Sequence, residues 1–540
     1  MRAVSTILLA ALLSALTPVA SGFALLGPFK NHTNNAPDPW QGKPYAGLPG
    51  GLGYELYGDI GGPMFPFEAY RWNIPTIFYG FDQAFVDYFG QPGIDAVESA
   101  IATLNAVPPA SEMSTGLMEF PFDIKGEDGT AGSLNLLDLK SYTLCLLLEQ
   151  LGLANPERFV WGLHARDPYP QWGFTNYSAF LMNYDPVTYQ PTRFVNGVIY
   201  NYEIVDSLGP LGGEWASAVE WYQLDPFYLP YSSVAGGLGS TDFQFGSSPR
   251  EFYWWSGLLS GQFFRGLTRD DVGGLRFLLR RDNKVWEPLL PGVIGAGTNS
   301  SNFVNVALRG GIEKLTFLRL PFDALTGQFL PLTNSFLDAY YTNDLCVTQT
   351  LQRVVARPDI LFTARDLGVQ VEYFNNDPEL IATSLLERSG TGGWQNNGAL
   401  NGREGAGGPG LITPGATITF STPGKYVLGS DRATPRSVSF LWQWASFDGS
   451  KKPIVAHLGP APAGEIVHLG TRRIDIAEIP NFEWTLLGEA GQAYRVDYSI
   501  NLIDWFELSR HYNFNGVLVI HHPLFNPQGF FRVVSEPWPF

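Results

Sequence analysis

The segment LDLKSYTLCLLLEQLGL, residues 137–153, predicts a helix that is apolar over most of its circumference. Asp138 is placed to open this helix, and Gly152 with Pro156 beyond it is placed to end it. A helix without a polar face is expected in the middle of a domain rather than at its surface. Glu149 and Gln150 interrupt the run, so it is not expected to span a membrane.

Regular structure extends from this helix in both directions. Upstream, Trp72–Gly80 predicts a strand, and apolar residues at helical spacing predict a helix over Gly93–Asn105. Downstream, Arg193–Ser207 reads as one or two strands, and Thr268 with Asp271 has the spacing of a capping box that opens another helix. We therefore predict an α+β N-terminal domain over residues 25–300.

Beyond residue 300, helical periodicity fades. Short β-branched and aromatic runs, such as Asp359–Thr363 and Thr417–Phe420, alternate with turn residues, as is typical of β-sandwiches. We predict a β-rich domain over residues 301–463 and a C-terminal β-sandwich module over residues 464–540. The expected fold class is thus an α+β domain followed by all-β modules of the Ig-like β-sandwich type.

The first 22 residues have the features of a signal peptide. Arg2 precedes a short apolar run over Val4–Leu16, Pro18 breaks it, and the small residues Ala20, Ser21 and Gly22 follow, so we expect cleavage near residues 20–24. The chain is predicted to be secreted, extracellular or on the outer cell surface, with no transmembrane segment after processing.

The net charge of −17 argues against a nucleic-acid partner, because phosphate binding requires clustered Lys and Arg. Aromatic residues make up 14% of the chain. Two dense clusters could form a contact surface for a polysaccharide or another cell-surface protein, or could simply be core. The candidates are Trp215, Trp221, Tyr222, Trp254 and Trp255.

Motifs for bound ions or cofactors are weak, and no cofactor is predicted. Asp123, Glu127 and Asp128 cluster in a turn-rich segment and could hold Ca²⁺, but the segment lacks the alternating ligand spacing and the distal Glu of an EF-hand loop, which favours a solvated acidic turn. Cys145 and Cys346 could form one disulfide in an oxidising compartment, or Cys145 could be a buried free thiol.

The C-terminal 70 residues carry a Tyr-x-Val-x-x-Ser-x-Asn-Leu-x-x-Trp core. Its members are Tyr494, Val496, Ser499, Asn501, Leu502 and Trp505. This stretch resembles a small Ig-like β-sandwich module of exported bacterial proteins, and the upstream chain resembles longer exported bacterial proteins without an assigned function. Such modules are accessory, so the resemblance implies architecture and location but no chemistry.

The N-terminal domain also has a weaker similarity to matrixin-type metallopeptidases of the metzincin group. The elements that match in order are Trp72 and Pro75, the Ile94–Leu104 helix, Leu151-Gly152-Leu153 and Asp271–Leu275. The alignment places Cys145 and Glu149 where the two zinc-binding histidines belong and Leu146 where the general base belongs. The similarity therefore implies a peptidase-like scaffold without its metal.

These observations favour an exported, non-catalytic structural or binding protein of the cell surface or extracellular space. The alternative is a secreted hydrolase, either a peptidase-fold relative or a carbohydrate-active enzyme. The two differ in whether the first domain contains a cleft with convergent His, Asp or Glu side chains.

Overall fold

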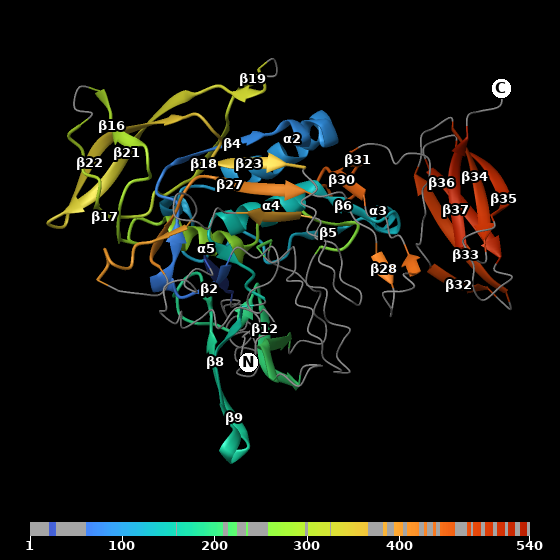
Figure 1. Cartoon of the computed structure of the whole chain (residues 1–540), viewed down its shortest axis with the longest axis horizontal. Coiled ribbons are helices and arrows are strands. Elements are labelled where there is room, and N and C mark those ends of the chain that lie inside the picture. The colour runs from blue at the N-terminus through green and yellow to red at the C-terminus, as the bar shows by residue number, and fades with distance from the viewer. Residues whose placement is uncertain are drawn as a thin grey trace, which may run out of the picture.

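The protein is described by a computed structural model (Figure 1). The described residues are 21–28, 61–157, 159–208, 214–223, 234–235, 258–297, 301–323, 326–364, 382–385, 394–402, 408–420, 426–428, 436–438, 443–459, 472–476, 479–487, 492–499, 505–513, 517–523 and 530–536. The predicted signal peptide over residues 1–22 falls almost entirely outside these ranges. Within them the chain is rich in strands and contains few helices.

A five-stranded mixed sheet forms the centre of the molecule. Its order is β18 (Thr316–Arg319), β4 (Thr76–Phe81), β23 (Ile360–Thr363), β27 (Ala416–Phe420) and β24 (Ala382–Leu385). The first four strands run parallel and β24 is antiparallel at the edge. Parallel strands are normally covered on both faces, and β4 is accordingly buried over most of its length.

This sheet joins the two ranges that were predicted as separate units. The strand β4 comes from the predicted 25–300 domain, whereas its neighbours β18 and β23 come from the predicted 301–463 domain. A second junction pairs β6 (Leu136–Asp138) with β30 (Gln443–Phe447). Residues from both ranges therefore share one hydrophobic core. Beyond residue 300 the sequence indicated strands of β-sandwich type, whereas β18, β23 and β27 lie in the parallel part of this sheet. Runs of strand-forming residues in a sequence do not specify the direction of pairing.

Helix α2 (Gln83–Asn105) begins ten residues before the predicted start at Gly93. The Asp82 carboxylate accepts a hydrogen bond from the backbone N–H of Phe85, which caps an earlier first turn. Gly90 then has a left-handed φ of 60°, so the helix bends there before its second, predicted part continues.

Helix α4 (Leu139–Gln150) confirms the predicted buried helix, with Asp138 at its N-cap. Nearly every residue of α4 is buried, and it packs against α2. Gly152 ends the segment with φ +96°, and a Cβ there would lie 2.7 Å from the carbonyl oxygen of Tyr70. Glycine is thus required at this C-terminus both by conformation and by space.

The capping box at Thr268 is also confirmed, and it opens α5 (Arg269–Leu279). Arg193–Ser207 forms two strands that meet at Asn196 and Gly197, namely β11 (Phe194–Val195) and β12 (Val198–Leu208).

A second sheet of five antiparallel strands extends from the body of the molecule (Figure 1). Its order is β15 (Val285–Glu287), β17 (Ala307–Arg309), β21 (Leu332–Thr342), β22 (Leu345–Val355) and β16 (Val293–Gly295). The hairpin β21–β22 turns at Asn343 and Asp344, which both have positive φ, as the twist of a two-residue hairpin requires.

The remaining described strands up to residue 459 form small sheets. They are β1 (Phe23–Pro28) with β2 (Gly61–Met64), β7 (Leu153–Ala154) and β10 (Asn183–Tyr184); β3 (Tyr70–Arg71) with β26 (Gly410–Ile412) and β25 (Trp394–Asn396); β5 (Lys125–Glu127) with β14 (Gln262–Phe264); β8 (Trp161–Tyr169) with β9 (Phe174–Leu181); β12 with β13 (Glu214–Gln223); β19 (Phe322–Asp323) with β20 (Gln328–Phe329); β28 (Tyr426–Leu428) with β29 (Arg436–Val438); and β30 with β31 (Val455–His457).

The C-terminal region consists of two three-stranded antiparallel sheets. One contains β32 (Arg472–Ile476), β33 (Ile479–Leu487) and β36 (Val517–Pro523), and the other contains β35 (Phe506–Asn513), β34 (Gln492–Ser499) and β37 (Phe530–Glu536). Tyr494, Val496 and Ser499 of the predicted core are buried on β34, whereas Asn501 and Leu502 lie outside the described residues.

Candidate functional site

The position that zinc ligands would occupy in the matrixin alignment lies in the hydrophobic core. Cys145 is 1% exposed and belongs to the same core cluster as Leu144, Leu146 and Leu148. Glu149, one turn further along α4, is half-buried. Within the described ranges, no group of three or more His, Cys, Asp or Glu side chains is arranged to hold a metal ion.

The N-cap of α4 holds a buried carboxylate. Asp138 accepts hydrogen bonds from the Ser141 hydroxyl, from the Ser141 N–H at 3.1 Å and from the Phe447 N–H at 3.0 Å. Burial raises the pKa of Asp138 from 3.8 to about 6, although these hydrogen bonds oppose the shift. The carboxyl thus links α4 to β30 while it carries the cost of a buried charge at neutral pH.

We expect Asp138→Asn to change how stability depends on pH. Because the folded pKa is raised, protonation of Asp138 favours folding below about pH 4, and this contribution is lost as the pH rises through about 6. The free energy of unfolding of the wild type should therefore fall by up to roughly 3 kcal/mol relative to that of the variant across this window. Denaturant unfolding of both proteins between pH 4 and 7.5 measures the effect. A difference that is constant with pH would contradict it.

Two of the three calcium candidates have local structural roles. Asp123 accepts a hydrogen bond from the N–H of Lys125 at 2.9 Å, and Asp128 caps α3 (Gly129–Ser133) through the N–H of Ala131 at 2.8 Å. Glu127 lies in β5, where it is paired with Gln262 of β14. A turn and a helix cap account for two of these carboxylates, and the proposal of bound Ca²⁺ stays a prediction.

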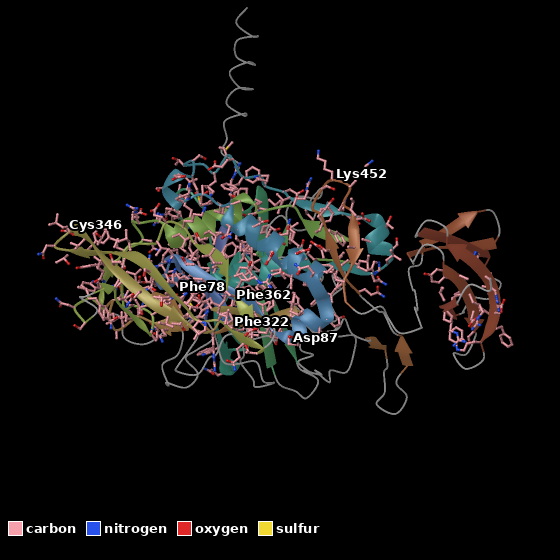
Figure 2. All side chains as sticks on the ribbon, turned by 90° about the horizontal axis from the view of Figure 1, so that it is seen from above. Phe78, Asp87, Phe322, Cys346, Phe362 and Lys452 are labelled. Carbon is pink, nitrogen blue, oxygen red and sulfur yellow. The ribbon has the colours of Figure 1, made fainter. Side chains whose placement is uncertain are left out.

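The other candidates are spread over the chain. Cys145 and Cys346 are both free thiols, with Cys145 in the core and Cys346 exposed on the hairpin β21–β22 (Figure 2). Trp215, Trp221 and Tyr222 lie in β13, but their side chains are outside what the structure describes. Trp254 and Trp255 also lie outside the described residues.

Two buried carboxylates stand at the N-terminus of α5, where the sequence indicated only the capping box. The Asp271 carboxylate accepts from the N–H and hydroxyl of Thr268 and from the backbone N–H groups of Val234 and Ala235. The Asp270 carboxylate accepts from the N–H of Gly22 at 2.8 Å and of Asn196 at 2.6 Å.

The Asp270 carboxylate also accepts a hydrogen bond from the hydroxyl of Ser21. Burial raises the pKa of both Asp270 and Asp271, and that of Asp270 the more clearly. Segments far apart in the sequence thus converge on the start of α5.

One face of the second sheet is an exposed apolar surface that the sequence did not indicate. A row of residues paired across neighbouring strands runs over four strands of this sheet. In it, Trp286 pairs with Leu308, Leu308 with Tyr341, and Tyr341 with Cys346. Opposed residues in antiparallel strands point to the same face. Leu337 is 71% exposed on this face, which we call the outer face.

Apolar side chains are spread over the whole outer face rather than confined to one edge. The apolar members are Trp286, Ile294, Leu308, Leu337, Tyr341 and Val354, and the other outward positions of β21 and β22 are Thr, Ser, Ala, Gln and Cys346. None of the outward positions of this described sheet carries a charge. Lys284 borders it, with Nζ 4.0 Å from the centroid of the Tyr341 ring.

The sequence interpretation missed this face. The signal was present as two runs rich in Thr, Leu, Val and aromatic residues, over Leu332–Thr342 and Leu345–Val355, joined by Asn343-Asp344 at a turn. That pattern predicts a hairpin, although it does not show which side is left uncovered.

No protein-family model, curated protein or solved structure matches the chain. None of the described helices combines the length and apolar character needed to cross a membrane.

Proposed function

We propose that this chain is an exported, non-catalytic structural protein that binds a second copy of itself through the outer face. Its first part would be an α+β scaffold similar to a matrixin-type peptidase without the zinc ligands, and its C-terminal part an accessory Ig-like β-sandwich module. The observation that carries the proposal is the uncharged outer face, on which Leu337, Val354 and Trp286 are exposed.

Charge limits where a second copy could bind. The chain carries a net charge of −17, so two copies repel each other over most of their surfaces. A face without charged side chains permits contact between copies at the lowest electrostatic cost. Its exposed aliphatic side chains Leu337, Val354 and Ile294 offer a sugar no hydrogen-bonding group, whereas they suit apolar contact with a protein.

The packing of α4 supports the non-catalytic part of the proposal. Cys145 and Leu146 are each 1% exposed, so substrate would have to reach these positions through the core. A secreted hydrolase with zinc at this helix would contradict the proposal. It would be revealed by stoichiometric zinc and peptide cleavage that are both lost on replacing a residue of α4.

We expect Leu337→Glu to weaken self-association by about 100-fold, because each copy would bring a carboxylate into an apolar contact. Leu345→Glu is the matched control: Leu345 lies in the same hairpin and is 70% exposed, but it points to the opposite side of β22 from Cys346. Sedimentation equilibrium of the three proteins at several concentrations measures the dimer dissociation constant.

Three results would overturn the proposal. They are a wild type that stays monomeric, equal weakening by both variants, and a monomer that binds a polysaccharide on a glycan array. In the last case the contact surface would belong to a carbohydrate-binding protein instead.

A further inference from the structure

One edge of the second sheet is closed by an asparagine side chain. Among the described strands, β15 pairs with β17 alone, so its other side is an edge of the sheet. On that side the N–H of Trp286 donates to Asn401 Oδ1 at 3.3 Å, and Asn401 Nδ2 donates to the carbonyl oxygen of Trp286 at 3.0 Å. The amide thus supplies the donor and the acceptor that a neighbouring strand would supply to this residue.

The turn that carries Asn401 is fixed by hydrogen bonds of its own. The backbone N–H and the Nδ2 of Asn401 both donate to the carbonyl oxygen of Asn397 at 3.1 Å. The N–H of Asn397 in turn donates to the carbonyl oxygen of Pro409 at 2.8 Å. The amide of Asn401 is therefore held beside β15 by the fold of its own segment.

The same arrangement closes one edge of the central sheet. Among the described strands, β18 pairs with β4 alone. On the open side of β18, the N–H of Phe317 donates to Asn105 Oδ1 at 2.7 Å, and Asn105 Nδ2 donates to the carbonyl oxygen of Phe317 at 3.0 Å. Asn105 is the last residue of α2, whereas Asn401 lies in a turn, so two unrelated segments close two edges with the same chemistry.

An open β15 would give this protein a second way to associate. An edge residue without a partner presents N–H and C=O groups that can pair with the edge of another chain. Trp286 lies on the outer face as well as on this edge, so a copy paired at β15 would extend the outer face. The opposite edge, β16, has three residues and lies between Gly292 and Gly297, whose φ values of 81° and 74° end the strand on both sides. Edges this short pair poorly.

We propose that Asn401 determines the mode of self-association, because it closes β15 and leaves the outer face as the contact surface of the second sheet. This inference rests on the self-association in the proposed function and specifies its geometry. One contact surface per copy gives a closed dimer in which two outer faces pack against each other. An additional open surface at β15 would let each copy contact two others, and dimers would then join into chains.

Asn401→Ala is therefore expected to convert the dimer into longer assemblies. Within the described residues, the two bonds to Trp286 are the hydrogen bonds that join the turn to β15, and the variant removes both. In sedimentation equilibrium the average mass should stop at the dimer for the wild type and keep rising with concentration for Asn401→Ala. A variant whose mass stops where that of the wild type stops would overturn the inference.

A double variant separates the edge from the outer face. Leu337→Glu with Asn401→Ala can pair only through β15, where Trp286 of each copy would exchange two hydrogen bonds with Trp286 of the other. This variant should form dimers and no chains. Its dissociation constant should be roughly tenfold smaller than that of Leu337→Glu alone, as two net backbone hydrogen bonds allow. Equal dissociation constants would contradict the closure of β15 by Asn401.

Two control variants distinguish an open edge from a general loss of stability. Gln349→Ala removes the same pair of amide bonds, to the N–H and carbonyl of Val304 at 2.9 and 2.8 Å, but Val304 lies outside the strands. Asn401→Asp loses the donor to Trp286 but leaves a negative charge at the edge, and charged side chains prevent edges from pairing. Neither control should form chains, and chains formed by either would overturn the inference.

Asn105→Ala tests the edge of the central sheet in the same way. It should also raise the average mass above that of the dimer, and no increase would overturn the closing role of Asn105. The outcomes separate this inference from the proposed function. A monomeric wild type would contradict contact through the outer face, whereas dimers of Asn401→Ala under the same conditions would still support the closure of β15. A monomeric Asn401→Ala would contradict both.

Discussion

Replacing Asp359 with alanine is expected to lower the free energy of unfolding by roughly 3–5 kcal/mol, because it leaves a buried arginine without its partner. Arg353 on β22 donates to both carboxylate oxygens of Asp359, at 2.7 and 2.5 Å, and both side chains are almost completely buried. Asp359 also accepts the backbone N–H of Phe78 on β4 at 2.7 Å. One carboxylate thus attaches the second sheet to the central sheet, where Phe78 and Phe362 lie (Figure 2).

Chemical denaturation at pH 7 measures this loss, and Asp282→Ala is the control. Asp282 also pairs with an arginine, Arg280, but its side chain is 73% exposed, and exposed pairs contribute about 0–1 kcal/mol. The double variant Arg353→Met with Asp359→Ala should recover part of the loss, since no unpaired charge is left buried. A loss at Asp359 as small as that at Asp282 would show that the pair does not join the sheets.

Trp72→Ala is expected to lower the free energy of unfolding by about 3–5 kcal/mol, because it opens a cavity beside α4. Trp72 is 1% exposed, and its Nε1 donates to the carbonyl oxygen of Gln150 at 2.8 Å. That carbonyl belongs to the last turn of α4, where backbone acceptors have no partner within the helix. Both the packing and the end of the helix therefore depend on this side chain.

Trp72→Phe separates the two contributions, since it keeps most of the volume and removes the donor. A loss of about 1–2 kcal/mol is expected for this variant. Trp172→Ala serves as the control for tryptophan removal, because Trp172 is 73% exposed. Thermal or denaturant unfolding measures all three, and equal effects at positions 72 and 172 would rule out the role given to Trp72.

The elements that follow from local chemistry were predictable from the sequence. The buried helix α4 was set by its continuous apolar circumference and by Asp138, and the start of α5 by the capping box at Thr268. The start of α2 was predicted ten residues too late, because Gly90 and Pro92 indicate a break that the structure accommodates as a bend. Residues within one or two turns of each other determine such features.

The pairing of distant segments was decided only by the tertiary structure. The sequence by itself determined the acidic charge, the helices at α4 and α5 and the runs that become strands. It did not determine that β4 lies between β18 and β23, that Ser21 and Gly22 meet Asp270, or that one face of the second sheet stays uncharged and uncovered. The physical reason is that propensity and capping act between near neighbours, whereas strand partners and buried charge contacts here join residues more than two hundred positions apart, where only the packed core selects the pairing.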